Sequence, residues 1–89
     1  MPYIAPSRRH AIDQGTLPRG VGELNYVLTQ TIVEYVQRRG ISYATLSEVR
    51  VALSDAGTEF YRRIVGPYED RKAEENGDVY EPLLGKLEG

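Results

Sequence analysis

The sequence predicts an all-α protein of 89 residues, organised as an antiparallel hairpin of two long helices. Three observations support this prediction. Apolar residues recur at intervals of three and four along two long stretches, which is the period of an amphipathic helix. Residues suited to helix ends flank both stretches. The connection between the stretches is only about four to six residues long, which favours antiparallel neighbours.

The first 20 residues form a short arm in this prediction. They hold three of the five prolines, and Pro6 is suited to the first turn of a short helix over Ser7–Asp13 that Gly15 closes. A segment this short is not stable alone. We therefore expect the arm to dock on the rest of the chain.

The first long helix is predicted over residues 22–39. Glu23 lies in its first turn and Arg38 and Arg39 in its last, which matches the helix dipole. Gly40 is a suitable terminator because glycine adopts left-handed backbone angles readily. The apolar face has the i, i+3, i+4, i+7 spacing and consists of Leu24, Val27, Leu28, Thr31, Ile32, Tyr35 and Val36.

The second long helix is predicted over residues 45–76, with a kink at Gly66-Pro67 because proline disrupts helical hydrogen bonding. Thr45 and Glu48 have the spacing of a capping box. The helix ends at Asn76-Gly77. Residues 1–80 then make one helical domain, and residues 81–89 a flexible tail. The apolar stripe of this helix consists of Leu46, Val49, Leu53, Ala56, Phe60 and Ile64.

Composition excludes several classes of protein. The net charge of −2 lacks the basic excess of a nucleic-acid-binding domain. The absence of cysteine excludes disulfides, cysteine–zinc sites and thiol nucleophiles. No apolar run approaches the ~20 residues of a membrane span, and the first ten residues are too polar for a signal peptide. We expect a cytoplasmic protein that binds neither membrane nor nucleic acid.

Two helices of this length bury too little apolar surface to fold alone, and Tyr26 and Val33 lie off the main stripe of the first helix. A spare apolar face is usually covered by another copy of the chain. The sequence therefore predicts a homo-oligomer.

Catalysis is not expected. His10 is the one histidine, and a lone histidine in an arm is a weak general base. The sequence contains no P-loop, nucleophile elbow, dinucleotide-binding glycine pattern or histidine pair for a metal. We predict a protein that is not an enzyme, with no catalytic residue, no metal and no cofactor.

A binding site for a small anion is the strongest functional prediction. Tyrosine rings beside arginines can stack on a base and hold a phosphate, and antiparallel packing would bring the start of the first helix near the end of the second. An alternative explanation is that Glu59, Glu69 and Asp70 pair with the arginines, and that side chains cap the helix ends. The predicted ligand-binding residues are Tyr3, Arg8, Asn25, Tyr26, Arg62, Arg63, Tyr68 and Asn76.

The segment 74–80 has two interpretations. Its carboxylates around an Asn-Gly turn could hold a cation, but they lack the ligand spacing of a calcium-binding EF-hand loop. The favoured interpretation is a helix terminator that leads into Tyr80.

Several separated motifs resemble a family of small, uncharacterised proteins of phages and prophages. The motifs are the opening Met1–Ile4, the segment Gly22–Tyr26, Tyr61–Arg63, Pro67–Lys72 and Glu75–Tyr80. The resemblance covers about residues 1–80 and implies a viral setting in the host cytoplasm, with no established activity.

In this setting we expect a non-enzymatic binding protein that sequesters an anionic ligand, such as a cyclic nucleotide, at subunit junctions and so counters host defence. One alternative is an inhibitor or accessory factor that binds a basic surface of a host protein through the acidic residues 69–81. Another alternative is a small virion or assembly component.

Overall fold

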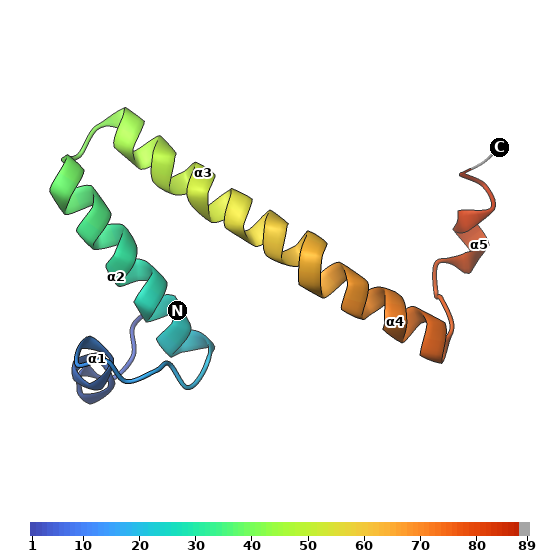
Figure 1. Ribbon diagram of the computed structural model, residues 1–89, viewed down its shortest axis with the longest axis horizontal. Coiled ribbons are helices and arrows are strands. Elements are labelled where there is room, and N and C mark those ends of the chain that lie inside the picture. The colour runs from blue at the N-terminus through green and yellow to red at the C-terminus, as the bar shows by residue number, and fades with distance from the viewer. Residues whose placement is uncertain (88–89) are drawn as a thin grey trace. The chain divides into compact units, whose positions relative to one another are not determined.

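The computed structural model describes residues 1–87, and all regular secondary structure within them is helical (Figure 1). The prediction of an all-α protein is confirmed. The helices in chain order are α1 (Pro6–Asp13), α2 (Val21–Arg39), α3 (Tyr43–Phe60), the π-helix η1 (Tyr61–Val65), α4 (Gly66–Asn76) and α5 (Glu81–Leu84).

The chain divides into two compact units, Met1–Arg50 and Val51–Gly89, which are called unit 1 and unit 2 below. The single domain predicted over residues 1–80 therefore stays a prediction.

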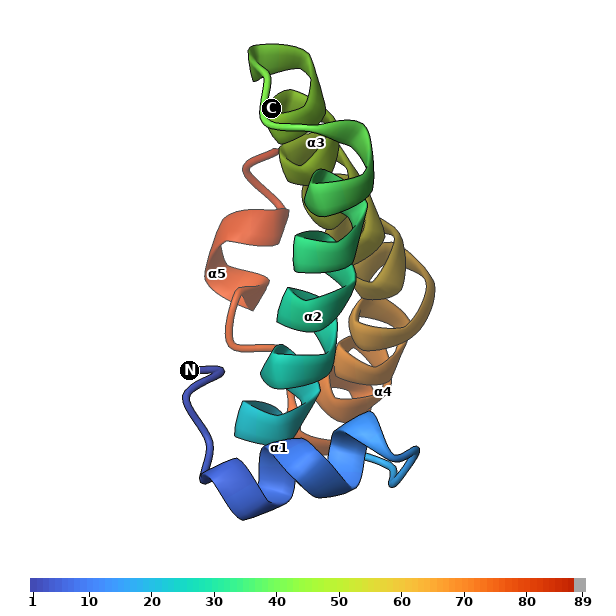
Figure 2. The same cartoon turned by 90° about the vertical axis from the view of Figure 1, so that its left-hand side faces the viewer.

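Unit 1 is built on the contact of the arm with α2. The short helix α1 lies across the N-terminal end of α2 (Figure 2). The residues before α1 pass close to α2 at Gly22, where an added Cβ atom would lie 3.3 Å from the carbonyl oxygen of Met1. Tyr26 of α2 is buried, with 5% of its surface exposed. The predicted arm is thus present, and a glycine and a tyrosine of α2 form its docking surface.

The helix after α2 begins earlier than the sequence predicted, and a different residue caps it. α3 starts at Tyr43, and the backbone N–H of Thr45 donates to the hydroxyl of Ser42 at 3.1 Å. Thr45 lies inside the first turn and is buried. The predicted capping box of Thr45 and Glu48 is therefore wrong, because Ser42 caps the helix before Thr45 can.

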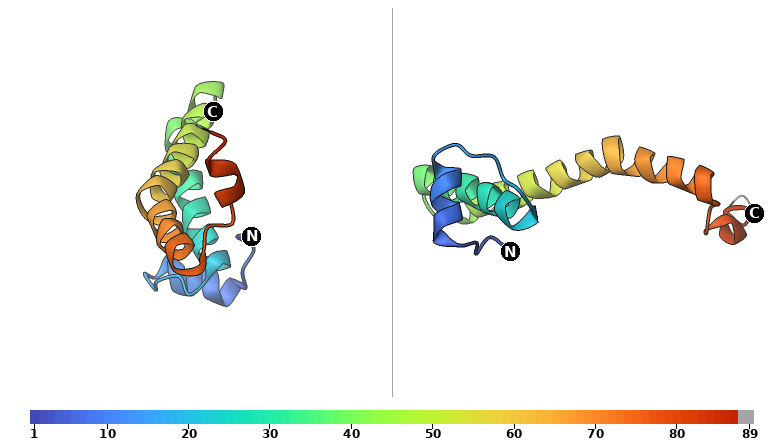
Figure 3. Two further views of the ribbon diagram at one scale, coloured as in Figure 1. Left: turned by 90° about the vertical axis from the view of Figure 1, so that its right-hand side faces the viewer. Right: turned by 90° about the horizontal axis from the view of Figure 1, so that it is seen from below.

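The helical run does not stop at Gly66-Pro67. Helical structure continues from Val51 to Asn76 in unit 2 (Figure 3), and its irregular part is the π-helix immediately before this dipeptide. The backbone N–H of Gly66 donates to the Tyr61 carbonyl, five residues back. Proline has no N–H and its ring crowds the preceding turn. A wider π turn before Pro67 accommodates the ring without ending the helix.

α4 ends at Asn76, and Gly77 follows with a φ of 92°, a left-handed angle that suits glycine. The predicted helix end is therefore where the sequence placed it. Residues 81–89 were predicted to be a flexible tail. Within the described part of this tail, residues 81–84 form the single turn α5, with Pro82 near its start. Residues 88 and 89 lie outside the described residues.

Candidate functional site

Arg8 and Glu23 form a bidentate ion pair in unit 1. The Arg8 guanidinium donates from Nε to Glu23 Oε2 at 2.9 Å and from Nη2 to Glu23 Oε1 at 2.8 Å. The backbone N–H of Arg19 adds a third donor to this carboxylate at 3.1 Å. These hydrogen bonds, chiefly those from Arg8, lower the pKa of Glu23 to about 2. Arg8 therefore fastens α1 to α2, and its guanidinium is already occupied.

Tyr26 was predicted to stack on a ligand, but the structure places its ring in the interior of unit 1. Its hydroxyl donates to the Asp13 carboxylate, with oxygen–oxygen distances of 2.9 and 3.1 Å. The ring consequently offers no open face within unit 1. No pattern in the sequence indicated Asp13 as the partner of Tyr26, because the two residues meet only after α1 docks.

The remaining predicted residues of unit 1 lie near the same end of α2. Asn25 is half-buried, and its side-chain oxygen accepts a hydrogen bond from the Thr29 hydroxyl at 3.3 Å. Tyr3 is exposed in the arm. Arg9, its neighbour in the arm, donates to the Ile4 carbonyl at 2.9 Å. Of Tyr3, Arg9 and Asn25, Tyr3 alone has a largely exposed side chain.

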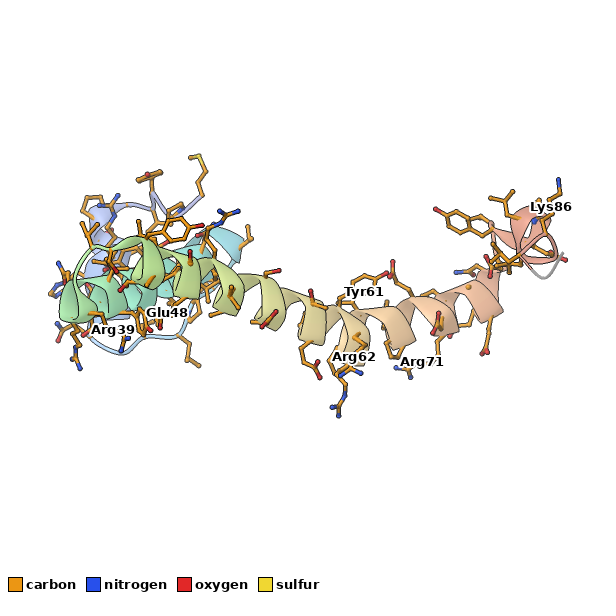
Figure 4. The ribbon with its side chains drawn as sticks, turned by 90° about the horizontal axis from the view of Figure 1, so that it is seen from above. Arg39, Glu48, Tyr61, Arg62, Arg71 and Lys86 are labelled. Atoms are coloured by element: carbon orange, nitrogen blue, oxygen red, sulfur yellow. The ribbon has the colours of Figure 1, made fainter. Side chains whose placement is uncertain are left out.

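The other end of α2 meets the start of α3 through Glu48. The Tyr35 hydroxyl donates to Glu48 at 2.8 Å, and Arg39 lies 3.6 Å from the same carboxylate and 5.5 Å from the Tyr35 ring centroid. Arg39 and Glu48 lie together at this corner in Figure 4. The hydrogen bond to Glu48 raises the pKa of Tyr35. Glu48 thus links two helices instead of capping one.

In unit 2, Arg62 and Arg63 share one acidic neighbour. Arg62 Nη2 lies 2.9 Å from both carboxylate oxygens of Glu59, and Arg63 Nη1 lies 3.7 Å from one of them. All three side chains are exposed, so these pairs contribute little stability. The ion pairing that the sequence offered as an alternative is present, and both guanidiniums still face solvent.

Tyr61 and Tyr68 lie beside charged neighbours on unit 2. The Tyr61 hydroxyl donates to Glu69 at 2.8 Å, which raises the pKa of Tyr61. Figure 4 shows Tyr61 leaving the helix on the side opposite Arg62 and Arg71. The Tyr68 ring is 55% exposed, and the Lys72 ammonium lies 5.7 Å from its centroid. Tyr68 therefore has a face available for stacking.

The segment after α4 behaves as a helix terminator. The backbone N–H of Gly77 donates to the Ala73 carbonyl at 2.9 Å, and Asp78 Oδ1 accepts from the backbone N–H of Tyr80 at 2.8 Å. Asn76 is exposed at the last position of α4. Among residues 1–87, no group of three or more acidic or histidine side chains is arranged to hold a metal ion.

The predicted ligand residues divide between the units. Tyr3, Arg8, Asn25 and Tyr26 belong to unit 1, and Arg62, Arg63, Tyr68 and Asn76 belong to unit 2. The single cleft predicted from the sequence therefore stays a prediction. Within unit 2, the two arginines and Tyr68 lie within two turns of one helical run.

Unit 2 also carries exposed apolar side chains. None of its described side chains is buried, and Phe60 is 60% exposed. Leu53, Ala56, Phe60 and Ile64 follow one another at helical spacing, and the π-helix carries this stripe on toward Tyr68. These five residues are called the unit 2 stripe below. A second uncovered apolar group lies after α4, on Tyr80, Leu83, Leu84 and Leu87.

These features define a small helical protein whose N-terminal arm is bound to α2 and whose units bury little apolar surface. The chain belongs to the family described as "Domain of unknown function (DUF6899)", which it matches over residues 1–79. No curated protein and no solved structure matches it. Within residues 1–87, no helix combines the length and the apolar character needed to cross a bilayer.

Proposed function

We propose that this protein is a non-enzymatic binding protein that acts as an assembly of its own copies. The observation that supports this proposal is the distribution of apolar side chains. Tyr26 is the one buried large hydrophobic residue among those described, whereas 22 large hydrophobic residues are exposed. Monomeric soluble proteins seldom leave so many large apolar side chains uncovered while burying so few. In the proposed assembly, α2 and the helix after it pack as antiparallel neighbours.

The ligand in this proposal is a small anion of the cyclic nucleotide class, bound where subunits meet. Arg62 and Arg63 share the exposed Glu59 carboxylate, so a phosphate can replace that carboxylate as their partner. The exposed ring of Tyr68 supplies a stacking surface, and Asn76 supplies amide groups that can bond to a base edge. Tyr26 is not included because its ring is buried, and Arg8 is not included because Glu23 already binds its guanidinium.

The proposal places the protein in a phage or prophage, where it would sequester a nucleotide signal of host defence. The resemblance of the motifs to phage and prophage proteins supports this setting. The solvent-exposed guanidiniums of Arg62 and Arg63 support an anionic ligand. Sequestration needs stoichiometric binding only, so it requires no catalytic residue.

The test is a thermal-shift screen of the purified chain against cyclic di- and trinucleotides, with inorganic phosphate as the comparison. The expected result is a stabilising shift with at least one cyclic nucleotide that the double variant Arg62→Gln, Arg63→Gln loses. Arg38→Gln is the matched control, because Arg38 forms a similar exposed pair with Glu34 at 3.6 Å. Absence of a shift with every nucleotide, or a shift that both variants retain, contradicts the proposal.

A second candidate function is binding to a basic surface of a host protein. The acidic residues of α4 and the following turn favour it, because they are exposed. Within the described residues, Glu75 alone among these acids forms an ion pair, with Lys72. Reversing Glu74 and Glu75 to lysine should abolish capture of such a protein from host lysate. Glu34→Lys is the control. Detection of the chain in purified virus particles would instead favour a virion or assembly role.

A further inference from the structure

The π-helix η1 determines which side chains of unit 2 lie on the same side of the helical run. In an unbroken α-helix, residues eight positions apart point about 80° away from each other, because each residue advances by about 100°. A π turn contains one residue more than an α turn. It therefore removes about 100° of rotation, and residues eight positions apart across η1 come within about 20° of alignment.

The hydrogen bond between Tyr61 and Glu69 demonstrates this alignment. The two residues are eight positions apart across η1, and the Tyr61 hydroxyl donates to the Glu69 carboxylate at 2.8 Å. The Tyr61 ring reaches Glu69 by passing beside Gly66. A Cβ atom added at Gly66 would lie 3.8 Å from ring carbon Cε1 and 3.3 Å from the carbonyl oxygen of Tyr61. Tyr61 and Glu69 thus join the two ends of the π turn.

The same rotation brings arginines from both sides of η1 together. Arg63 and Arg71 are also eight positions apart, so they come into alignment as Tyr61 and Glu69 do. Arg62, nine positions before Arg71, would point about 180° away from it in an unbroken α-helix. Figure 4 shows that Arg62 and Arg71 instead leave the helix on the same side, opposite Tyr61. The π turn thus places three arginines on one side of unit 2.

Arg71 differs from the other two arginines in its partners. Arg62 and Arg63 share the Glu59 carboxylate, whereas Arg71 is exposed and takes part in no ion pair with any of residues 1–87. None of the three arginines belongs to the unit 2 stripe. Packing of the unit 2 stripe in the proposed hairpin therefore leaves their guanidiniums available to a ligand.

The spacing of the arginines suits a ligand with more than one phosphate group. Eight residues separate Arg63 from Arg71, which corresponds to roughly 12 Å along the helix. A phosphate that replaces Glu59 as the partner of Arg62 and Arg63 leaves Arg71 without a partner. A guanidinium binds phosphate through paired hydrogen bonds. A second phosphate group of the same ligand would supply the acceptors that Arg71 lacks.

We infer that Arg71 is a third ligand-binding arginine, which binds a second phosphate group of a ligand whose first phosphate lies on Arg62 and Arg63. The hydrogen bond between Tyr61 and Glu69 is a positioning contact, because it holds the π turn that brings Arg71 to this side. The inference rests on the proposed function. It narrows the ligand to nucleotides with at least two phosphate groups, such as cyclic di- and trinucleotides.

The test is isothermal titration calorimetry of the full chain with cyclic di-AMP, cyclic di-GMP and cyclic tri-AMP. Cyclic AMP and cyclic GMP are the comparisons with one phosphate. Arg71→Gln should weaken binding of the di- or trinucleotide at least about tenfold, because charge-assisted hydrogen bonds are lost, and should not affect binding of a mononucleotide. Lys86→Gln removes the same charge elsewhere in unit 2 and should bind like the unchanged chain.

The role of the π turn is tested by changing the helix register while all three arginines stay in place. Pro67→Ala restores a backbone N–H and removes the ring that the π turn accommodates, so the same residues can form an α-helix. Arg71 would then point about 100° away, and binding of the dinucleotide should fall as in Arg71→Gln. Removing Val65 from the Pro67→Ala chain takes out the additional residue, so Arg71 returns to its side and tight binding should return.

Tyr61→Phe removes the hydrogen bond to Glu69 and keeps the ring. It should weaken binding of the dinucleotide by about threefold, since one hydrogen bond no longer supports the π turn, and leave binding of a mononucleotide unchanged. Circular dichroism is used to check that each variant stays helical.

The outcomes keep a failure of the inference distinct from a failure of the proposed function. Absence of binding by every cyclic nucleotide contradicts the proposed function and the inference with it. If Arg71→Gln leaves binding of a di- or trinucleotide unchanged, or if a mononucleotide binds as tightly, the inference alone is wrong. If Pro67→Ala or Tyr61→Phe binds like the unchanged chain, or if removal of Val65 restores nothing, the π turn does not position Arg71.

Discussion

Tyr26 is the residue on which the interior of unit 1 depends most. It is the one buried large hydrophobic residue among those described, and its hydroxyl reaches the Asp13 carboxylate of the docked arm. The side chain therefore contributes twice, once through the buried ring and once through the hydrogen bond. A substitution that keeps the ring separates these contributions.

Tyr26→Phe removes the hydroxyl and keeps the ring. We expect the free energy of unfolding to fall by about 1 kcal/mol, the usual net contribution of one intramolecular hydrogen bond. Urea unfolding followed by circular dichroism measures the change. Tyr43→Phe is the matched control, because Tyr43 is among the most exposed tyrosines and should tolerate the change. Equal stability of both variants would show that the bond to Asp13 contributes nothing.

Glu23 makes the stability of unit 1 dependent on pH in acid. Its pKa falls from 4.5 to about 2 in the folded chain, chiefly because Arg8 donates hydrogen bonds to the ionised carboxylate. The folded state therefore binds this proton less readily than the unfolded state. The corresponding stability is complete above pH 4.5 and is lost as the pH falls from 4.5 toward 2.

Glu23→Gln should remove this part of the acid-induced loss of stability. The measurement is the free energy of unfolding of both chains across the same pH window, and the curve of the variant should be flatter. Glu34→Gln, which removes an exposed carboxylate of the same helix, should keep the slope of the unchanged chain. Parallel curves for Glu23→Gln and the unchanged chain would contradict the role of the Arg8 contact.

At the scale of the helices, Ser42 sets the start of α3. Its hydroxyl accepts the backbone N–H of Thr45 and lies 3.1 Å from the Thr45 hydroxyl. An N-cap hydroxyl contributes about 1 kcal/mol. Ser42→Ala should lower the free energy of unfolding by about that amount, and thermal unfolding followed by circular dichroism measures it. Ser54→Ala, an exposed substitution inside α3, should be neutral or slightly stabilising. If Ser54→Ala costs as much as Ser42→Ala, the cap is not responsible.

The sequence predicted the helices well and their ends less well, for a physical reason. A period of three and four identifies α2 and the run from α3 to α4, because the pattern extends over many turns. The start of α3 has two capping candidates three residues apart, Ser42 and Thr45. Both hydroxyls are suited to an N-cap. Starting the helix after Ser42 adds further helical hydrogen bonds, so the earlier cap is favoured. The π-helix was not predicted, because the sequence indicates only that Pro67 must disturb the turn before it.

Some contacts of the predicted site residues could be expected from the sequence and others could not, again for a physical reason. The pairing of Arg62 and Arg63 with Glu59 involves residues three and four positions apart on one helix, so the sequence suffices to predict it. The burial of Tyr26 depends on how α1 docks across α2, which no local pattern encodes. The apolar face of Tyr80, Leu83, Leu84 and Leu87 had a helical period in the sequence, and the presence of Pro82 and two glycines led to the prediction of a flexible tail there.

For the whole molecule, the proposed assembly predicts a stability that depends on concentration. A chain that folds and assembles together gains stability by mass action. The melting temperature should therefore rise as the protein is concentrated over a roughly hundredfold range, as scanning calorimetry can measure. Light scattering at the same concentrations supplies the mass of the assembly. A melting temperature that is independent of concentration, with the mass of one chain throughout, would contradict the proposed assembly.

The π-helix sets the direction in which the side chains of α4 leave the helix. A π turn contains one residue more than the α turn it replaces. If the same residues formed an unbroken α-helix, every side chain after Tyr61–Val65 would be rotated by about 100° about the helix axis. The Tyr68 ring and the carboxylates of α4 would then face a different side of unit 2 from the one they face now.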